Sequence, residues 1–193
     1  MGIVQQDVEF FQALKALQLE NNRLSDFSAL AGLPRLSQLF LSCNRIQRLP
    51  EASPGHFQML QVLDLSFNFV QADDIFASDT GWSRLPTLRD LDLSGNDIAT
   101  LPSALGSFPS LRRLALDFNK LTAPCLKPLS ALPRLQALEL ANNRISGLPA
   151  RLLKNPCAFS SLTSLDLSNN VVRCGPCPRC YSYPLFNALT SPG

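Results

Sequence analysis

The residues in this 193-residue sequence best suited to chemistry are its six cysteines and its single histidine. Cys174, Cys177 and Cys180 form C-x-x-C-x-x-C, and three thiolates at this spacing could make one corner of a zinc site. A closed zinc site or an iron–sulfur cluster needs a fourth ligand, and His56 lies far upstream. We therefore predict no metal site and no cofactor. Zinc binding in the C-terminal segment is the alternative to free or oxidised thiols.

No other arrangement of residues predicts catalysis. The sequence contains no nucleophile elbow, phosphate-binding loop or paired metal ligands, so we predict that the protein is not an enzyme. Seventeen basic and fifteen acidic residues give a net charge of +2, and the longest basic run is Arg112-Arg113. This balance predicts no binding to nucleic acid. The lack of a long apolar run predicts no membrane span.

One pattern, L-x-x-L-x-L-x-x-N-x-[LIV], organises the chain. Its copies begin at Leu14, Leu36, Leu60, Leu88, Leu111, Leu135 and Leu162. Within each copy two leucines alternate with other residues, which is typical of a short strand with one buried face. One such unit cannot bury its apolar face alone, so we expect the copies to stack into a parallel sheet with a continuous leucine core.

The pattern resembles that of the leucine-rich repeat family over residues 11–172. The resemblance implies an α/β fold, a leucine-rich repeat solenoid. In this fold a curved right-handed coil carries a parallel β-sheet on its concave face and irregular or short helical returns on its convex face. We divide the chain into an N-terminal partial coil or cap (1–13), seven repeats (14–172) and a C-terminal Cys- and Pro-containing cap or tail (173–193).

Two narrower resemblances concern the kind of repeat. The short repeats resemble those of intracellular members of the family, including ciliary and centrosomal scaffolds. The run D-L-S-F-N at 64–68, the long insertion after it and the later L-P-x-L-R and N-R-I segments are similar to the family of X-ray radiation resistance associated proteins. Both resemblances imply a cytoplasmic or axonemal scaffold.

Two columns of residues are expected inside the coil. The first holds the asparagines that end each strand, Asn22, Asn44, Asn68, Asn96, Asn119, Asn143 and Asn170. Their amides can satisfy backbone groups where the chain leaves the sheet, so we expect Asn119→Ala to lower stability by about 1 to 3 kcal/mol. The second is an apolar wall behind the sheet, Phe11, Leu33, Phe57, Leu85, Phe108, Leu132 and Phe159. We expect Phe67, Phe118 and Trp82 to be structural.

The concave face is the surface that core packing leaves available for binding. Its candidate partner-binding residues are Gln38, Phe40, Asp64, Asp90, Asp92, Arg113, Asp117, Glu139 and Asp166. Asp64, Asp90 and Asp92 are expected to form an acidic patch bordered by Arg89, Arg112 and Arg113, with Phe40 as an apolar anchor. The alternative is that L-D-L-S is a common repeat filler whose aspartates are merely solvated.

We therefore predict a non-catalytic, intracellular scaffold that binds one or more protein partners on its concave face. Cys43, Cys125 and Cys157 fall alone in different repeats, and none of the twelve asparagines forms an N-x-[ST] sequon, which favours the cytoplasm. One alternative is a ciliary or axonemal component that binds microtubule or axonemal proteins. Another is an extracellular recognition ectodomain, in which Cys174, Cys177 and Cys180 would be oxidised.

Overall fold

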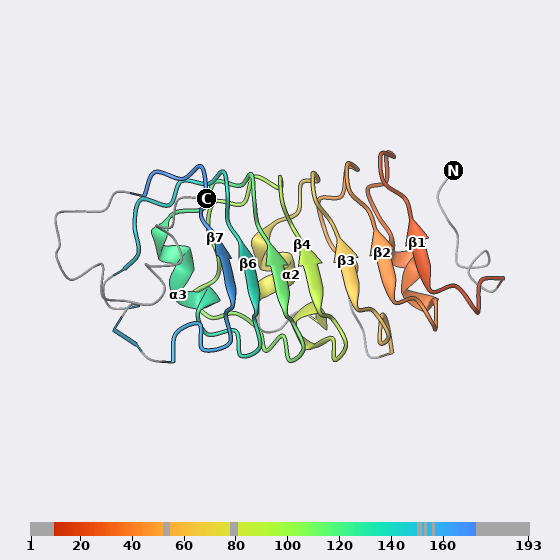
Figure 1. The fold of residues 1–193 in the computed structure, drawn as a ribbon. Coiled ribbons are helices and arrows are strands. Elements are labelled where there is room, and N and C mark those ends of the chain that lie inside the picture. Colours follow the sequence, from red (N-terminus) through yellow and green to blue (C-terminus); the bar gives the residue numbers. More distant parts are fainter. Residues whose placement is uncertain are drawn as a thin grey trace.

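Seven short parallel strands form one sheet in the computed structural model, which describes residues 10–51, 55–77, 81–149, 152, 154–155 and 157–172. The strands are β1 (Ala16–Gln18), β2 (Gln38–Phe40), β3 (Val62–Asp64), β4 (Asp90–Asp92), β5 (Arg113–Ala115), β6 (Ala137–Glu139) and β7 (Ser164–Asp166). They lie side by side in chain order (Figure 1). The predicted C-terminal cap at 173–193, with its three cysteines, and most of the predicted N-terminal cap lie outside the described residues.

The register of the sheet follows the sequence repeat. Leu17 pairs with Leu39, Leu39 with Leu63, and each later strand continues the same column to Leu165. Successive side chains on a strand point to opposite faces, so this column faces the core while the residues on either side of it face outward. The candidate residues of β2 to β7 that flank this column therefore lie on the outward face of the sheet.

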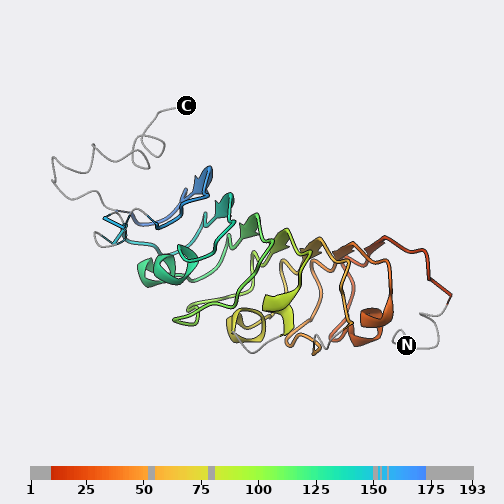
Figure 2. The same ribbon diagram turned by 90° about the horizontal axis from the view of Figure 1, so that it is seen from below.

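The returning segments lie on the opposite side from the strands (Figure 2). They contain the 3₁₀ helices η1 (Ser28–Gly32), η2 (Gly81–Arg84) and η3 (Ala123–Cys125) and the α-helices α2 (Ala72–Phe76) and α3 (Leu126–Leu129). In Figure 2 the strands line the inner side of the curved array. The predicted leucine-rich repeat solenoid, with a sheet on the concave face and short helical returns on the convex face, is confirmed. Within the described residues no helix is long and apolar enough to cross a membrane.

The asparagine column is buried in the middle of the array and more open at its ends. Asn44, Asn68, Asn96, Asn119 and Asn143 are buried. The amide of Asn119 donates to the carbonyls of Leu93 and Leu116, and its Oδ1 accepts the N–H of Ile98 at 2.9 Å. Each of these five buried amides thus joins its own turn to the neighbouring repeat.

The predicted apolar wall is correct in the middle and wrong at the start. The five central members, from Leu33 to Leu132, are buried, whereas Phe159 is half-buried. The side chain of Phe11 is 52% exposed. It occupies the wall position of the first repeat, where no described coil stacks against it, so the position alone does not bury it.

Trp82 belongs to the convex layer, as predicted. It is buried in η2, where its ring lies 5.0 Å from that of Phe57 and 5.9 Å from that of Phe27, measured between centroids. Its Nε1 donates to the carbonyl of Pro50 at 2.8 Å. The insertion after β3 is thus tied to the preceding return by an aromatic cluster and a hydrogen bond.

Candidate functional site

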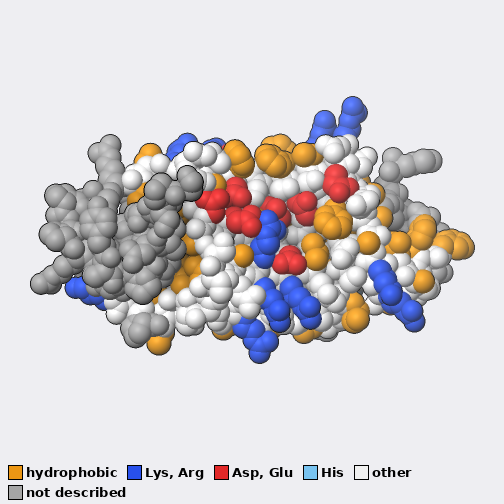
Figure 3. Space-filling model, in the orientation of Figure 1, with side chains coloured by type: hydrophobic (Ala, Val, Ile, Leu, Met, Phe, Trp, Pro, Cys, Tyr) orange, Lys and Arg blue, Asp and Glu red, His pale blue; other side chains and the backbone are white. Residues whose placement is uncertain are grey.

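Five carboxylates form a line across the concave face, one from each of the last five repeats. We call this line the acidic row; it consists of Asp64, Asp92, Asp117, Glu139 and Asp166. Four of them occupy one register position on β3, β4, β6 and β7, while Asp117 follows β5 by two residues. Figure 3 shows these red side chains gathered across the middle of the face, with hydrophobic side chains along the upper edge and basic ones below.

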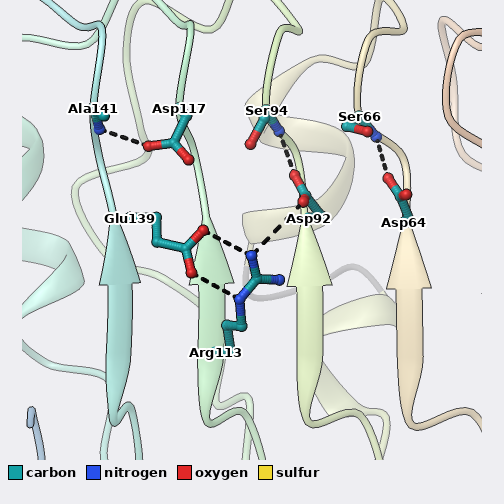
Figure 4. Close-up of polar contacts among 8 residues, drawn as sticks. All are labelled: Asp64, Ser66, Asp92, Ser94, Arg113, Asp117, Glu139 and Ala141. Carbon is teal, nitrogen blue, oxygen red and sulfur yellow. Dashed lines mark hydrogen bonds and ion pairs between the residues drawn. The ribbon is translucent and has the colours of Figure 1, made fainter. Parts of the chain in front are cut away.

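Arg113 is the basic residue within the row. Its guanidinium donates from Nε and Nη2 to the two carboxylate oxygens of Glu139, at 2.8 and 2.7 Å, and Nη2 lies 4.0 Å from Oδ2 of Asp92 (Figure 4). Ala115, at the row's register position on β5, carries only a methyl group, which is too small to block this reach. Hydrogen bonding to Glu139 is the main cause of the raised pKa of Arg113, so the guanidinium is charged and fixed in place.

Three aspartates of the row also serve their own turns. Oδ1 of Asp64 accepts the backbone N–H of Ser66, and Asp92 and Asp166 accept those of Ser94 and Ser168 in the same way, at 2.8 to 2.9 Å. Figure 4 draws the first two of these bonds. This Asx-type bond gives the D-L-S motif a structural role at the end of the strand. The aspartates are therefore more than solvated filler.

Asp117 makes a bond to the neighbouring repeat instead. Its Oδ1 accepts the backbone N–H of Ala141 at 2.6 Å. Burial raises the pKa of Asp117 above its ordinary value, and the nearby charges of Glu139, Asp166 and Asp92 raise it further. Burial also raises the pKa of Asp92, with a smaller contribution from Asp64. The row thus concentrates negative charge that a cation would stabilise.

The remaining predicted site residues surround this cluster without joining its hydrogen bonds. Asp90 lies on β4 in the column of Arg113 and contributes to its electrostatic environment. Gln38 is exposed and Phe40 half-buried, both on β2 near the first end of the row. Arg89 and Arg112 are exposed just before β4 and β5.

Sequence reasoning missed the exposure of Phe67 and Phe118. We expected structural residues, yet their side chains are 52% and 57% exposed. Both have a positive φ, of 52° and 53°, and both directly precede a ladder asparagine. Four of the other five repeats carry Asn or Gly at this position and the fifth carries Cys43, so an aromatic residue there is the signal that could have identified them.

The described residues offer little for catalysis or metal binding. In this part of the chain no group of three or more His, Cys, Asp or Glu side chains could hold a metal ion. Cys43, Cys125 and Cys157 are free thiols. Burial raises the pKa of Cys125 to about 12, which keeps this thiol protonated and unreactive.

Comparison with known families agrees with the geometry. The family described as Leucine rich repeat matches residues 34–98, and that described as Leucine Rich repeats (2 copies) matches residues 12–54. The chain is a leucine-rich repeat protein. Leucine-rich repeat proteins mediate protein–protein interactions.

Relatives of this leucine-rich repeat protein differ widely in kind. Osteomodulin of Bos taurus is 29% identical over 161 residues, which cover 83% of this chain and 36% of osteomodulin. X-ray radiation resistance-associated protein 1 of Mus musculus is 36% identical over 135 residues, covering 60% of this chain and 16% of that protein. The chain therefore spans well under half the length of both. A solved leucine-rich repeat protein of Leptospira interrogans superimposes with a TM-score of 0.63 at 25% identity, covering 87% of this chain and 46% of that one.

Proposed function

We propose that this chain is a non-catalytic, intracellular scaffold that binds basic groups of a protein partner with the acidic row on its concave face. The observation that supports the proposal is the alignment of five carboxylates on five consecutive repeats. A stacked sheet holds such side chains at fixed spacings, so a partner meets a preformed array and orders few side chains on the scaffold.

The sheet continues without carboxylates at these positions, although three of the aspartates also bond their own turns. The same register position carries Gln18 on β1, Phe40 on β2 and Ala115 on β5, and the sheet continues through all three. Burial is the main cause of the raised pKa values of Asp92 and Asp117, and the neighbouring carboxylates raise both further, so collecting the charges on one face adds mutual repulsion. A basic partner relieves that repulsion, which supports a binding role.

Arg113 has a positioning role in this proposal. Its two bonds to Glu139 hold that carboxylate in one orientation, while the row keeps a clear excess of negative charge. Exposed ion pairs contribute only about 0.2 to 1 kcal/mol each, so we expect several pairs to share the affinity and binding to weaken with salt. Phe40 supplies the apolar anchor at the β2 end.

Charge reversal tests the proposal. Asp92→Lys is expected to weaken binding of captured partners at least tenfold, a loss of about 1.4 kcal/mol. The matched control is Asp73→Lys, a reversal of an exposed carboxylate on convex helix α2. Affinity purification from cells with wild type and both variants gives the comparison. Equal loss with both variants, or retention with both, counts against the acidic row.

The intracellular location is part of the proposal, and osteomodulin supplies the observation for an alternative. Osteomodulin belongs to the extracellular matrix, which favours a secreted recognition module as the second candidate. Counting free thiols in protein isolated from its native source separates the two. We expect six reduced cysteines in an intracellular protein and a lower number in a secreted one.

The ciliary and axonemal proposal needs its own test. X-ray radiation resistance-associated protein 1 is similar to this chain over part of its length. The resemblance of the repeats to those of ciliary and centrosomal scaffolds rests on the same part of the sequence. Co-sedimentation with polymerised microtubules tests direct binding, with Asp92→Lys beside wild type. Protein that stays in the supernatant at all tubulin concentrations argues against a microtubule partner.

A further inference from the structure

A left-handed backbone conformation recurs at the residue before every ladder asparagine. The seven residues are Asn21, Cys43, Phe67, Gly95, Phe118, Asn142 and Asn169, with φ between 52° and 67°. Gly and Asn adopt this conformation readily, whereas it is strained for a bulky side chain. Two repeats nevertheless place phenylalanine here.

Burial does not explain these two phenylalanines. Phe57 and Phe108 also have positive φ, but their side chains are only 2% exposed and gain the stability of core packing. Phe67 and Phe118 have the same backbone strain with more than half of the side chain in solvent. Backbone strain that no core packing offsets is characteristic of binding sites.

The two rings form one surface feature, the aromatic pair. Their centroids lie 6.3 Å apart with an interplanar angle of 40°. Gly95 occupies the repeat between them, and a Cβ there would come within 2.6 Å of Cδ1 of Phe67. The missing side chain at Gly95 therefore lets the Phe67 ring lie over this turn and approach Phe118.

The aromatic pair borders the acidic row. Phe118 directly follows Asp117, and Phe67 lies three residues beyond Asp64. The backbone N–H of Phe67 donates to Ser94, the residue whose own N–H Asp92 accepts. Figure 3 shows hydrophobic side chains along the edge of the face directly above the carboxylates.

We propose that the aromatic pair is an apolar docking site for a protein segment in which an aliphatic or aromatic side chain is flanked by Lys or Arg. The inference rests on the proposed function, because the flanking cations would bind the acidic row. Charge complementarity determines this choice of partner: an apolar side chain seated on the pair places its neighbours beside Asp64, Asp92 and Asp117. Exposed aromatic residues beside charged ones are typical of binding hot spots.

The test uses the residue that the chain itself places at this position in three other repeats. In the double variant Phe67→Asn, Phe118→Asn the aromatic surface is lost while the left-handed conformation becomes favourable. Cys43→Asn makes the same kind of change at the equivalent position of the second repeat and serves as the matched control. The melting temperature of the double variant is expected to equal or exceed that of wild type, whereas a packing role for the pair would lower it.

The probe is a displayed library of random twelve-residue peptides selected on the wild-type chain. We expect enriched peptides to combine an apolar residue with neighbouring Lys or Arg. Their affinity, measured by fluorescence anisotropy, should fall at least tenfold in the double variant and stay unchanged in Cys43→Asn. Failure to enrich any peptide, enrichment without basic residues, or equal binding to the double variant overturns the inference.

The Asp92→Lys variant separates this inference from the proposed function. Loss of binding in Asp92→Lys but not in the double variant leaves the acidic row in place and removes the aromatic pair from the site. Loss in the double variant alone contradicts both the acidic row and the basic flanks of the inferred segment. Self-association of wild type that the double variant abolishes, measured by sedimentation equilibrium, would make a second copy the occupant and overturn the inference.

Discussion

Removing the amide of Asn119 is the perturbation whose effect follows most directly from the structure. Its Nδ2 donates to the carbonyls of Leu93, Leu116 and Asp117 at 3.0 to 3.1 Å. Its Oδ1 accepts the backbone N–H groups of Ile98 at 2.9 Å and Asn96 at 3.2 Å. Asn119→Ala removes all five bonds at a buried site.

The size of the effect depends on which groups lose their partner. The carbonyl of Asp117 also accepts the N–H of Gly95, so it stays bonded. The N–H of Ile98 is buried and loses its bond to Oδ1, and each group left unpaired costs about 1 to 3 kcal/mol. The carbonyls of Leu93 and Leu116 also keep a donor, from Asn96 and Asn143. Two backbone N–H groups, those of Ile98 and Asn96, lose their bonds to Oδ1, so the structure raises the expected loss in the free energy of unfolding from about 1 to 3 kcal/mol to about 2 to 4 kcal/mol.

Urea unfolding followed by far-ultraviolet circular dichroism measures this difference. Asn119→Asp is a second informative variant. It keeps the acceptor for the N–H of Ile98 but replaces the amide donor with a carboxylate oxygen that faces carbonyl oxygens. We expect it to be at least as destabilising as Asn119→Ala. Asn22→Ala is the control, since Asn22 is exposed and bonds only within its own turn, and should change stability by less than about 0.5 kcal/mol. Equal effects at positions 22 and 119 would refute the reasoning.

Three further predictions concern other parts of the fold. Gly106→Ala should destabilise by about 1 to 3 kcal/mol in urea unfolding, because its new Cβ would overlap the buried side chain of Ser83. Trp82→Phe should cost about 1 to 2 kcal/mol through loss of the bond to the Pro50 carbonyl, and an unchanged melting temperature would contradict this. The pKa of Asp92 is raised, so the folded state binds more protons than the unfolded state between the ordinary value of 3.8 and the raised value, and stability falls as pH rises through this window. Asp92→Asn keeps an acceptor for Ser94 and should therefore gain stability relative to wild type on going from pH 3 to pH 7; a pH-independent difference would oppose the assignment.

The sheet could be predicted from sequence because its determinants are local and repeated. The spacing of Leu91 and Leu93 before Asn96 defines a strand and its exit, and seven copies fix the register between neighbours. The same logic failed for Phe11, because burial at the wall position requires a coil stacked on both sides. Phe11 precedes the first copy of the repeat pattern, so the pattern does not tell whether another coil covers its side chain.

The sequence predicts which residues of the site share the concave face, but it does not predict which of their side chains bond one another. Register places Arg113 opposite Ala137, so its bidentate bond to Glu139 runs diagonally across the sheet and depends on the small side chain of Ala115. That contact requires side-chain conformations that periodicity does not specify. The exposure of Phe67 and Phe118 has a different origin: their hydrophobicity predicts packing, but the left-handed backbone conformation at this position leaves both side chains more than half exposed.

Site-specific photo-crosslinking tests the central claim, that the concave face binds a protein partner, most directly. A photoreactive phenylalanine replaces either Ala137, which is half-buried on β6 between Arg113 of β5 and Ser164 of β7, or Asp73 on convex helix α2. Irradiation in cells should give a protein adduct from position 137 that is absent from position 73 and is lost when Asp92→Lys is added. Adducts from position 73 alone, or an adduct at 137 that survives Asp92→Lys, would contradict binding through the acidic row.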